Sequence, residues 1–269
     1  MDAYKKMVVI FVDILGTKNN KLFEDKLKIH TLFHSEVKHN EQRNKEYVVY
    51  DRKVFSFSDC AYFFYYYKDN IDDNRKDDMK LIQIAMSNTS LSLLRILNAG
   101  YLIRGGISFG DAYFDDLGFF GPAVEEAYSL ECNYADVPII ALPTDLGKKF
   151  YDWEENITDL SIVNMLMSSR PQLVEGDNDK YFINLFYQLE SFMPSLKIEN
   201  EILSINTIKM NLLNVIARDK EKYGNTARRN TAVKNKSSIY QKLDWFEKYL
   251  STKHSHLKMD NIFGGYSGV

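Results

Sequence analysis

An uncharged run of branched and aromatic residues near the N-terminus limits the possible folds more than any other stretch. Residues 8–12 read VVIFV, a composition typical of a strand that is buried on both faces inside a sheet. The run ends on Asp13, and Gly16-Thr17 follows. A carboxylate at the end of a buried strand, beside backbone that can turn around an anion, could hold a metal-bound phosphate. An Asp that only caps the next helix explains this stretch equally well.

The overall composition is that of an ordinary globular protein. The 269 residues suffice for one large domain, or for one domain with an appendage. A net charge of -3 gives no general attraction for nucleic acid or an anionic membrane, so we expect neither as a partner. Two cysteines, Cys60 and Cys132, argue against a disulfide framework. With no signal pattern and no long apolar run, we expect a cytoplasmic protein.

The first half of the chain alternates between helical and β-rich segments. Apolar spacing predicts a helix within 18–45, and β-rich runs at 47–50, 53–57 and 60–67 predict a hairpin that turns at Ser58-Asp59. A helix over Met79–Leu97 and a strand over Tyr101–Phe109 follow, and Asp111–Phe114 is expected to turn back. The remaining predictions are a helix from Pro122, a strand over Val137–Leu142 and a helix over Asp145–Trp153. This order predicts an α/β (α+β) sandwich with a mostly antiparallel central sheet flanked by helices.

The second half gives weaker signals. Leu173–Glu175 and Tyr181–Phe186 could pair across a polar turn, and helices are expected at about Asn206–Tyr223 and Thr231–Thr252. We therefore expect a main domain over residues 1–153. Residues 154–269 would form a C-terminal extension, a hairpin and helices, packed on that domain.

Three charged residues suggest a common site. Asp59 stands in the hairpin turn, and in a β-α-β-β layout this turn can lie beside the end of the first strand, where Asp13 stands. Two carboxylates that share two divalent ions are typical of phosphoryl transfer. Arg104 precedes Gly105-Gly106 within a predicted strand, where glycines indicate the close approach of a ligand or of another backbone. The Arg104 guanidinium suits phosphate oxygens, although it could also pair with an acid in the core.

Four sequence blocks carry a resemblance to a known family. In order they are Phe11–Gly16 (FVDILG), Phe57–Asp59 (FSD), Arg104–Gly110 (RGGISFG) and Gly121–Ala127 (GPAVEEA). Together they resemble the class III nucleotidyl cyclase domain over residues 7–142. The resemblance implies the family's palm fold in residues 1–153 and a site formed between two subunits, so we expect a homodimer.

The resemblance also implies a role for several residues. Asp13 and Asp59 would bind two Mn²⁺ or Mg²⁺ ions, with the backbone carbonyl of Ile14 as a further ligand. The backbone from Leu15 through Gly16 and Thr17 would cradle the triphosphate, and Arg104 would contact it. The implied reaction is in-line attack of the ribose 3′-oxygen on the α-phosphorus, which expels pyrophosphate.

Departures from the family pattern make a pyrimidine substrate reasonable. Purine cyclases read the base with a Glu or Lys where this chain has Phe55, and the partner Asp of adenylyl cyclases falls on Gly118. An apolar ring cannot form hydrogen bonds with the edge of a purine, but it can narrow the pocket so that only a smaller base fits. Alternatively, Phe55 is a core residue without a role in base recognition. The family's transition-state Asn and Arg fall on Glu125 and Ser129. This combination resembles the pyrimidine cyclases of Pycsar antiphage systems, which make cyclic UMP or cyclic CMP for a separate effector.

The expected function is therefore the conversion of UTP, or CTP, to its cyclic monophosphate. Arg228 or Arg229 could replace the missing transition-state cation. Two other functions stay open: a catalytically silent cyclase-like module that binds a nucleotide or a partner, and another phosphoryl-transfer enzyme on a similar palm.

Overall fold

The apolar run at the N-terminus forms an interior strand of a large sheet. The computed structural model describes residues 3–16, 22–41, 48–158, 172–176, 179–191, 195–198, 201–227 and 234–251. Within these residues, β1 (Lys5–Ile14) lies in an eight-stranded sheet of order β2-β3-β1-β4-β6-β8-β7, and β5 pairs with β4 beside that path. Val8, Val9, Ile10 and Val12 of β1 are fully buried. The prediction of a strand covered on both faces is confirmed.

The predicted hairpin is also present, with β2 at Tyr50–Phe57 and β3 at Cys60–Tyr67. The two strands pair antiparallel from Tyr50 opposite Tyr67 to Phe57 opposite Cys60, so Ser58 and Asp59 form a two-residue loop. Ser58 has a φ of 57°, the left-handed backbone that such tight loops need. The predicted strand start at Tyr47 lies outside the described residues.

The other elements follow the expected order with shifted ends. Before and after the hairpin come α1 (Phe23–Glu41), η2 (Asp73–Arg75), α2 (Asp78–Asn98), β4 (Ile103–Phe114), β5 (Phe119–Phe120), α3 (Pro122–Asn133), β6 (Ile140–Leu142) and α4 (Thr144–Thr158). The C-terminal part contains β7 (Leu173–Glu175), β8 (Tyr181–Ile183), α6 (Tyr187–Ser191), β9 (Ser195–Ile198), β10 (Glu201–Ser204), α7 (Ile205–Ala227) and α8 (Lys234–Ser251). The predicted pairing of β7 with β8 is confirmed, whereas α6 and the β9–β10 pair were not predicted.

One expected turn is in the wrong place. Asp111–Phe114 does not turn back but continues β4, because β4 stays paired with β1 as far as Ala112 opposite Lys5. The chain reverses only at 115–118, where the Asp115 carboxylate accepts hydrogen bonds from the backbone N–H of Leu117 and Gly118. A side chain that satisfies the turn's own backbone donors fixes the reversal there.

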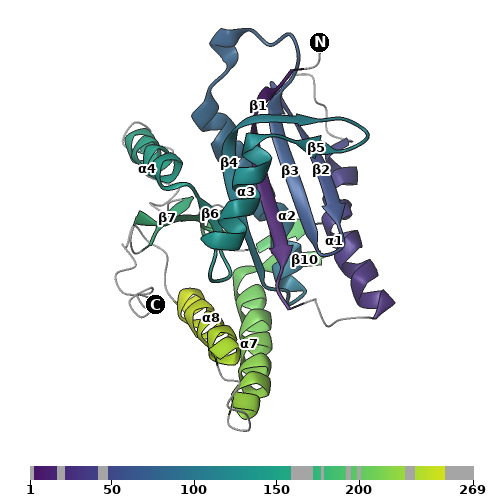
Figure 1. Ribbon diagram of the computed structural model, residues 1–269, viewed down its shortest axis with the longest axis vertical. Helices are drawn as coiled ribbons and strands as arrows, with labels where there is room; N and C mark the ends of the chain where they lie inside the picture. Colours follow the sequence, from purple (N-terminus) through teal and green to yellow (C-terminus); the bar gives the residue numbers. More distant parts are fainter. Residues whose placement is uncertain are drawn as a thin grey trace.

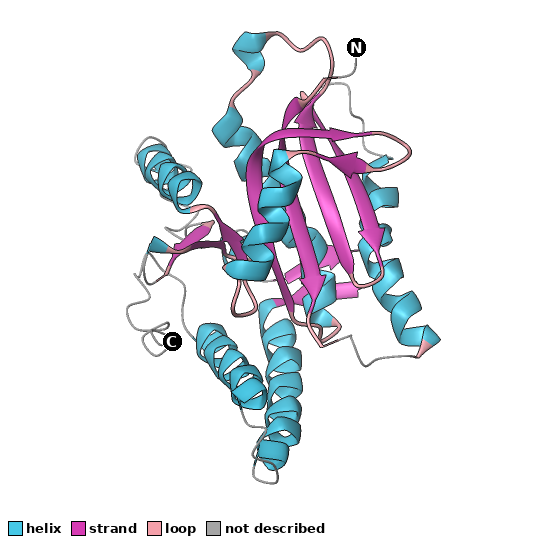
Figure 2. Cartoon of the chain, in the orientation of Figure 1, coloured by secondary structure: helices cyan, strands magenta, loops and turns pink. Residues whose placement is uncertain are grey.

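Two hydrophobic layers cover the sheet. Helix α2 packs on β1 and β3 over the larger core, and α3 packs on β1 and β4 over the smaller one (Figures 1 and 2). The predicted fold class, an α/β sandwich with a mostly antiparallel sheet flanked by helices, is confirmed. The β4–β6 contact is the parallel pair in this sheet.

The two glycines after Arg104 are explained by close backbone packing on opposite sides of β4. A Cβ on Gly105 would lie 2.0 Å from the Phe11 carbonyl oxygen of β1. One on Gly106 would lie 2.3 Å from the Ala127 carbonyl oxygen of α3. The sequence left open whether a ligand or another backbone approaches these glycines. At both Gly105 and Gly106 it is a neighbouring backbone.

The C-terminal half continues the same sheet and adds a pair of helices. β8 pairs with β6 and carries the sheet on to β7, while α7 and α8 lie side by side below it (Figure 1). A hydrogen bond of 3.0 Å from Asn211 Nδ2 to the Asn98 carbonyl oxygen ties α7 to the end of α2. Within the described residues, no helix has both the length and the hydropathy needed to cross a bilayer.

Candidate active site

The strand register brings Asp13 and Asp59 to the same end of the sheet. Asp13 of β1 is paired with Cys60 of β3, the residue after Asp59. The Ile14 N–H donates a hydrogen bond of 3.0 Å to the Asp59 carbonyl oxygen. The negative charge of Asp59 raises the pKa of Asp13, so the two carboxyl groups lie within electrostatic range.

Arg104 lies opposite Asp13 on the other side of β1. The two residues are register partners between β1 and β4, and Arg104 Nε lies 3.8 Å from Asp13 Oδ2. Arg104 also forms an ion pair with Glu131 of α3, whose side chain is only 4% exposed. The guanidinium therefore joins the strand that carries Asp13 to the helix above it.

Glu131 is a site residue that sequence reasoning missed. It lies on the buried face of α3 with Ala123, Val124 and Ala127. A charged residue in an otherwise apolar helical stripe is a signal that could have revealed it, since buried carboxylates need a partner. That partner is Arg104.

A second basic residue lies at the other carboxylate. Lys26 of α1 places its Nζ 3.7 Å from Asp59 Oδ2, with both side chains partly exposed. Each of the two acidic residues therefore faces one cation, Arg104 or Lys26. These cations offset part of the carboxylate charge, since Arg104 is also paired with Glu131.

The electrostatics of Asp13 favour a bound cation. Burial raises the pKa of Asp13 to about 6, and the neighbouring carboxylates of Glu131 and Asp59 add to this shift while Arg104 opposes it. A divalent ion would relieve this accumulation of negative charge. No group of three or more potential metal ligands occurs among the residues that the structure describes. Mg²⁺, however, is often bound by one or two carboxylates together with substrate phosphates, so the pair fits such an ion.

Phe55 belongs to an aromatic cluster on the face of the sheet that α3 covers in part. Its ring lies 5.0 Å from that of Phe119, 5.7 Å from Phe64 and 6.0 Å from Phe114, measured between centroids. The side chain is half-buried. Phe55 is therefore packed by other rings and also reaches the surface.

The backbone after β1 turns away from the sheet. The Leu15 N–H donates to the Leu102 carbonyl oxygen at 2.8 Å, and Gly16 has a φ of 82°. A Cβ on Gly16 would meet no atom within 4 Å, so the space around this turn is open. Thr17 lies outside the described residues.

The other positions that depart from the cyclase pattern lie on α3 and in the turn after β4. Glu125 and Ser129 are exposed on the outer side of α3, and Gly118 lies in the β4–β5 turn with a φ of 158°. Arg228 and Arg229 lie outside the described residues.

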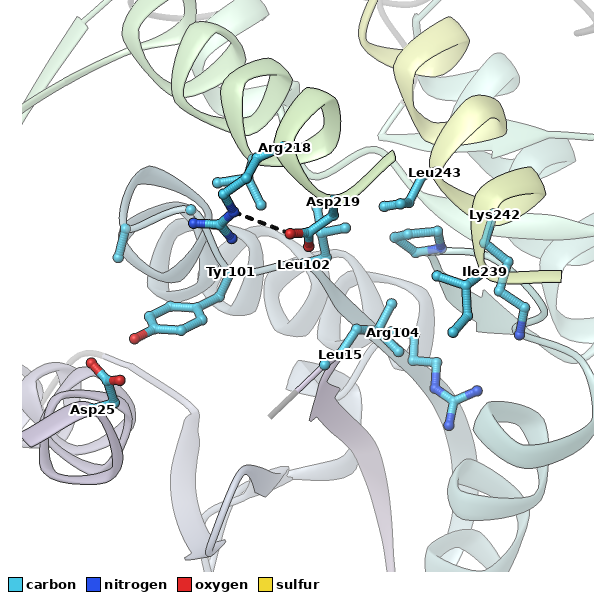
Figure 3. Close-up of a pocket in the computed structure, with 15 residues that line it drawn as sticks. Leu15, Asp25, Tyr101, Leu102, Arg104, Arg218, Asp219, Ile239, Lys242 and Leu243 are labelled. Carbon is cyan, nitrogen blue, oxygen red and sulfur yellow. Dashed lines mark hydrogen bonds and ion pairs between the residues drawn. The ribbon is translucent and has the colours of Figure 1, made fainter. Parts of the chain in front are cut away.

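A cavity of about 510 Å³ opens beside Arg104 (Figure 3). Its walls are Leu15 and Gly16 after β1, the α2–β4 connection at 99–102, and Pro138 before β6. Helix α1 contributes Asp25, and α7 and α8 close the remaining side. Arg104 thus contacts Asp13 and also lines a separate space between the sheet and the C-terminal helices.

The comparisons with known proteins show a distant structural likeness. Neither a protein-family model nor a curated protein matches the chain. Among solved structures, the chain is similar to a bacterial light-regulated adenylyl cyclase, with 12% identity and a TM-score of 0.36. The match covers 79% of this chain and 58% of that one. A likeness at this level assigns no activity, so the chemistry has to be inferred from the residues.

Proposed function

We propose that this protein is a metal-dependent nucleotidyl cyclase that converts UTP, or CTP, to the 3′,5′-cyclic monophosphate and pyrophosphate. The observation that carries the proposal is the pairing of β1 with β3 and β4, which brings Asp13, Asp59 and Arg104 to one end of the sheet. Two carboxylates and a guanidinium form a set suited to a metal-bound triphosphate.

Each residue of this set has a distinct role in the proposed reaction. Asp13 and Asp59 would hold two Mn²⁺ or Mg²⁺ ions, with the Ile14 carbonyl as a further ligand. When bound, such ions neutralise phosphate charge and favour ionisation of the attacking hydroxyl. Arg104 would contact the triphosphate, and the open backbone at Gly16 and Thr17 would lie along it.

A pyrimidine base is proposed because of Phe55. Its ring presents no hydrogen-bond donor or acceptor to a purine edge, and the rings of Phe64, Phe114 and Phe119 hold it in place. A fixed apolar surface at the base position reduces the space available and favours the smaller base.

A homodimer is proposed because part of the family's machinery is expected on a second subunit. The α3 positions that match the family's transition-state Asn and Arg, Glu125 and Ser129 in this chain, lie on its exposed outer side. Large apolar side chains are exposed nearby, with Phe120 at 55% and Tyr128 at 51%. A second copy of the chain would cover this surface and complete the site.

The cellular role is proposed from the sequence resemblance to Pycsar cyclases. The cyclic UMP or cyclic CMP would act as an alarm signal in the cytoplasm and would activate a separate effector during phage infection. That effector would bind the released product without forming a stable complex with the cyclase.

The direct test is product analysis with purified protein. The protein is incubated with Mn²⁺ and, separately, with ATP, GTP, CTP and UTP, and the products are identified by mass spectrometry. Cyclic UMP or cyclic CMP is the expected product. Cyclic AMP or cyclic GMP would refute the pyrimidine assignment, a linked dinucleotide would indicate another palm enzyme, and no product would indicate a silent module.

A further inference from the structure

The cavity beside Arg104 is walled on one side by the C-terminal helix pair. Val215, Arg218 and Asp219 come from α7, and Ile239, Lys242 and Leu243 come from α8 (Figure 3). The sequence resemblance ends at residue 142. These two helices therefore line the cavity beside Arg104 with residues that the cyclase motifs do not include.

Specific contacts hold this wall against the end of α2 and the loop that follows it. Asn211 of α7 is hydrogen-bonded to Asn98, and a Cβ on Gly100 would lie only 2.9 Å from Val215 Cγ2. Helix α8 is tied to α7 by Lys220, whose Nζ lies 2.9 Å from Asp244 Oδ1. The helix pair is therefore packed closely enough to position side chains in the cavity.

The charges in the cavity are unevenly distributed. Arg218 Nε lies 3.1 Å from Asp219 Oδ1, so these two charges largely offset each other. Asp25 lies beside Tyr101 on the α1 side of the cavity, while the side chains of Arg104 and Lys242 extend together on the other side (Figure 3). Two cationic side chains therefore lie at the end nearest Asp13, where Arg104 is also ion-paired with Glu131.

Lys242 differs from the other two cations of the cavity, Arg104 and Arg218, which each form an ion pair. It is half-buried and forms no ion pair with any residue in the described part of the chain. Burial lowers its pKa, and the nearby Arg104 lowers it further, against the weaker opposing effect of Asp136 and Glu131. An anion bound between Lys242 and Arg104 would remove this unfavourable arrangement.

We infer that the C-terminal helices complete a phosphate subsite, in which Lys242 of α8 acts with Arg104 of β4 to bind the pyrophosphate portion of the substrate. This inference rests on the proposed function and extends it, since it gives α8 a direct role in substrate binding. Leu15, Ile239 and Leu243 contribute apolar walls, and a charged contact is stronger where such walls lower the local dielectric constant.

The test is the binding of inorganic pyrophosphate, measured by calorimetry on the full chain with saturating Mg²⁺. Lys242→Gln is expected to weaken binding roughly 10- to 100-fold, as expected when one charged hydrogen bond is lost. Lys242→Arg keeps the charge and should bind within about threefold of the unchanged protein. Lys248→Gln is the matched control, because Lys248 lies on the same helix but pairs with Asp244 at the surface.

Three results would overturn the inference: no pyrophosphate binding by the unchanged protein, unchanged binding by Lys242→Gln, or equal losses in Lys242→Gln and Lys248→Gln. A thermal melt of each variant separates loss of binding from loss of fold. The cyclase proposal is judged separately by the products formed from the four nucleotides. Pyrophosphate binding that depends on Lys242 would support the subsite even if no cyclic nucleotide were formed.

Discussion

Replacing Asp13 by Asn should stabilise the metal-free protein while removing its response to metal. In the folded state the pKa of Asp13 is raised to about 6 from the ordinary 3.8, chiefly by burial and then by Glu131. That difference corresponds to about 3 kcal/mol against the charged form. Because the side chain is 26% exposed, solvent screening reduces this to roughly 1–2 kcal/mol.

The sign follows from proton linkage. A carboxyl group with a raised pKa binds more protons in the folded state, so the protein loses stability as pH rises from about 4 to 6. At pH 8 the unchanged protein carries the whole cost, and Asp13→Asn carries none of it. We therefore expect the variant to be more stable by about 1–2 kcal/mol at pH 8, with the difference vanishing near pH 4.

The assay is urea denaturation of both proteins at pH 4, 6 and 8, without metal and with Mn²⁺. Mn²⁺ should stabilise the unchanged protein and reverse the order at pH 8, because a ligand that binds only the folded state adds to its stability. Asp69→Asn is the control, since Asp69 is exposed and paired with Lys5, which lowers its pKa. The reasoning is refuted if Asp13→Asn is the less stable protein at pH 8 without metal, or if Mn²⁺ stabilises both equally.

Three further predictions concern single positions. Asp59→Ala should abolish nucleotide turnover with little change in the melting temperature, because the lost group is a ligand at a hairpin turn; normal turnover would remove Asp59 from the metal site. Gly106→Ala should lower the free energy of unfolding by about 1–3 kcal/mol or more, because the new methyl would lie 2.3 Å from the Ala127 carbonyl oxygen; an unchanged melting temperature would contradict this packing. Burial raises the pKa of Glu154 to about 7, so stability should fall as pH rises from about 4.5 to 7. Glu154→Gln should remove that fall and gain up to about 3 kcal/mol at pH 8, measured by urea denaturation at pH 5 and 8; a pH dependence like that of the unchanged protein would argue against it.

The strand order of the first half could be predicted because its signals are local. The apolar run of β1 and the two-residue break at Ser58-Asp59 each fix an element without help from distant residues. Their combination predicted which carboxylates would approach each other. The extension of β4 through Asp111 was missed, because pairing with β1 decides where that strand ends.

The surroundings of the site depend on contacts between residues that are far apart in sequence. Glu131 meets Arg104 only because α3 folds back over β4, and Lys26 meets Asp59 only because α1 lies beside the hairpin. The position of Lys242 requires α7 and α8 to pack against the connection after α2. The spacing of apolar and polar residues along the chain does not predict these contacts.

The continuation of the sheet into β8 and β7 has a practical consequence for work with shortened proteins. A chain cut after residue 153 would lose β8, and the backbone of β6 would present unpaired N–H and C=O groups to solvent. It would also lose the helices that bury the neighbouring apolar surface. Such a fragment should self-associate on purification, so crystallisation and enzymology both call for the whole polypeptide.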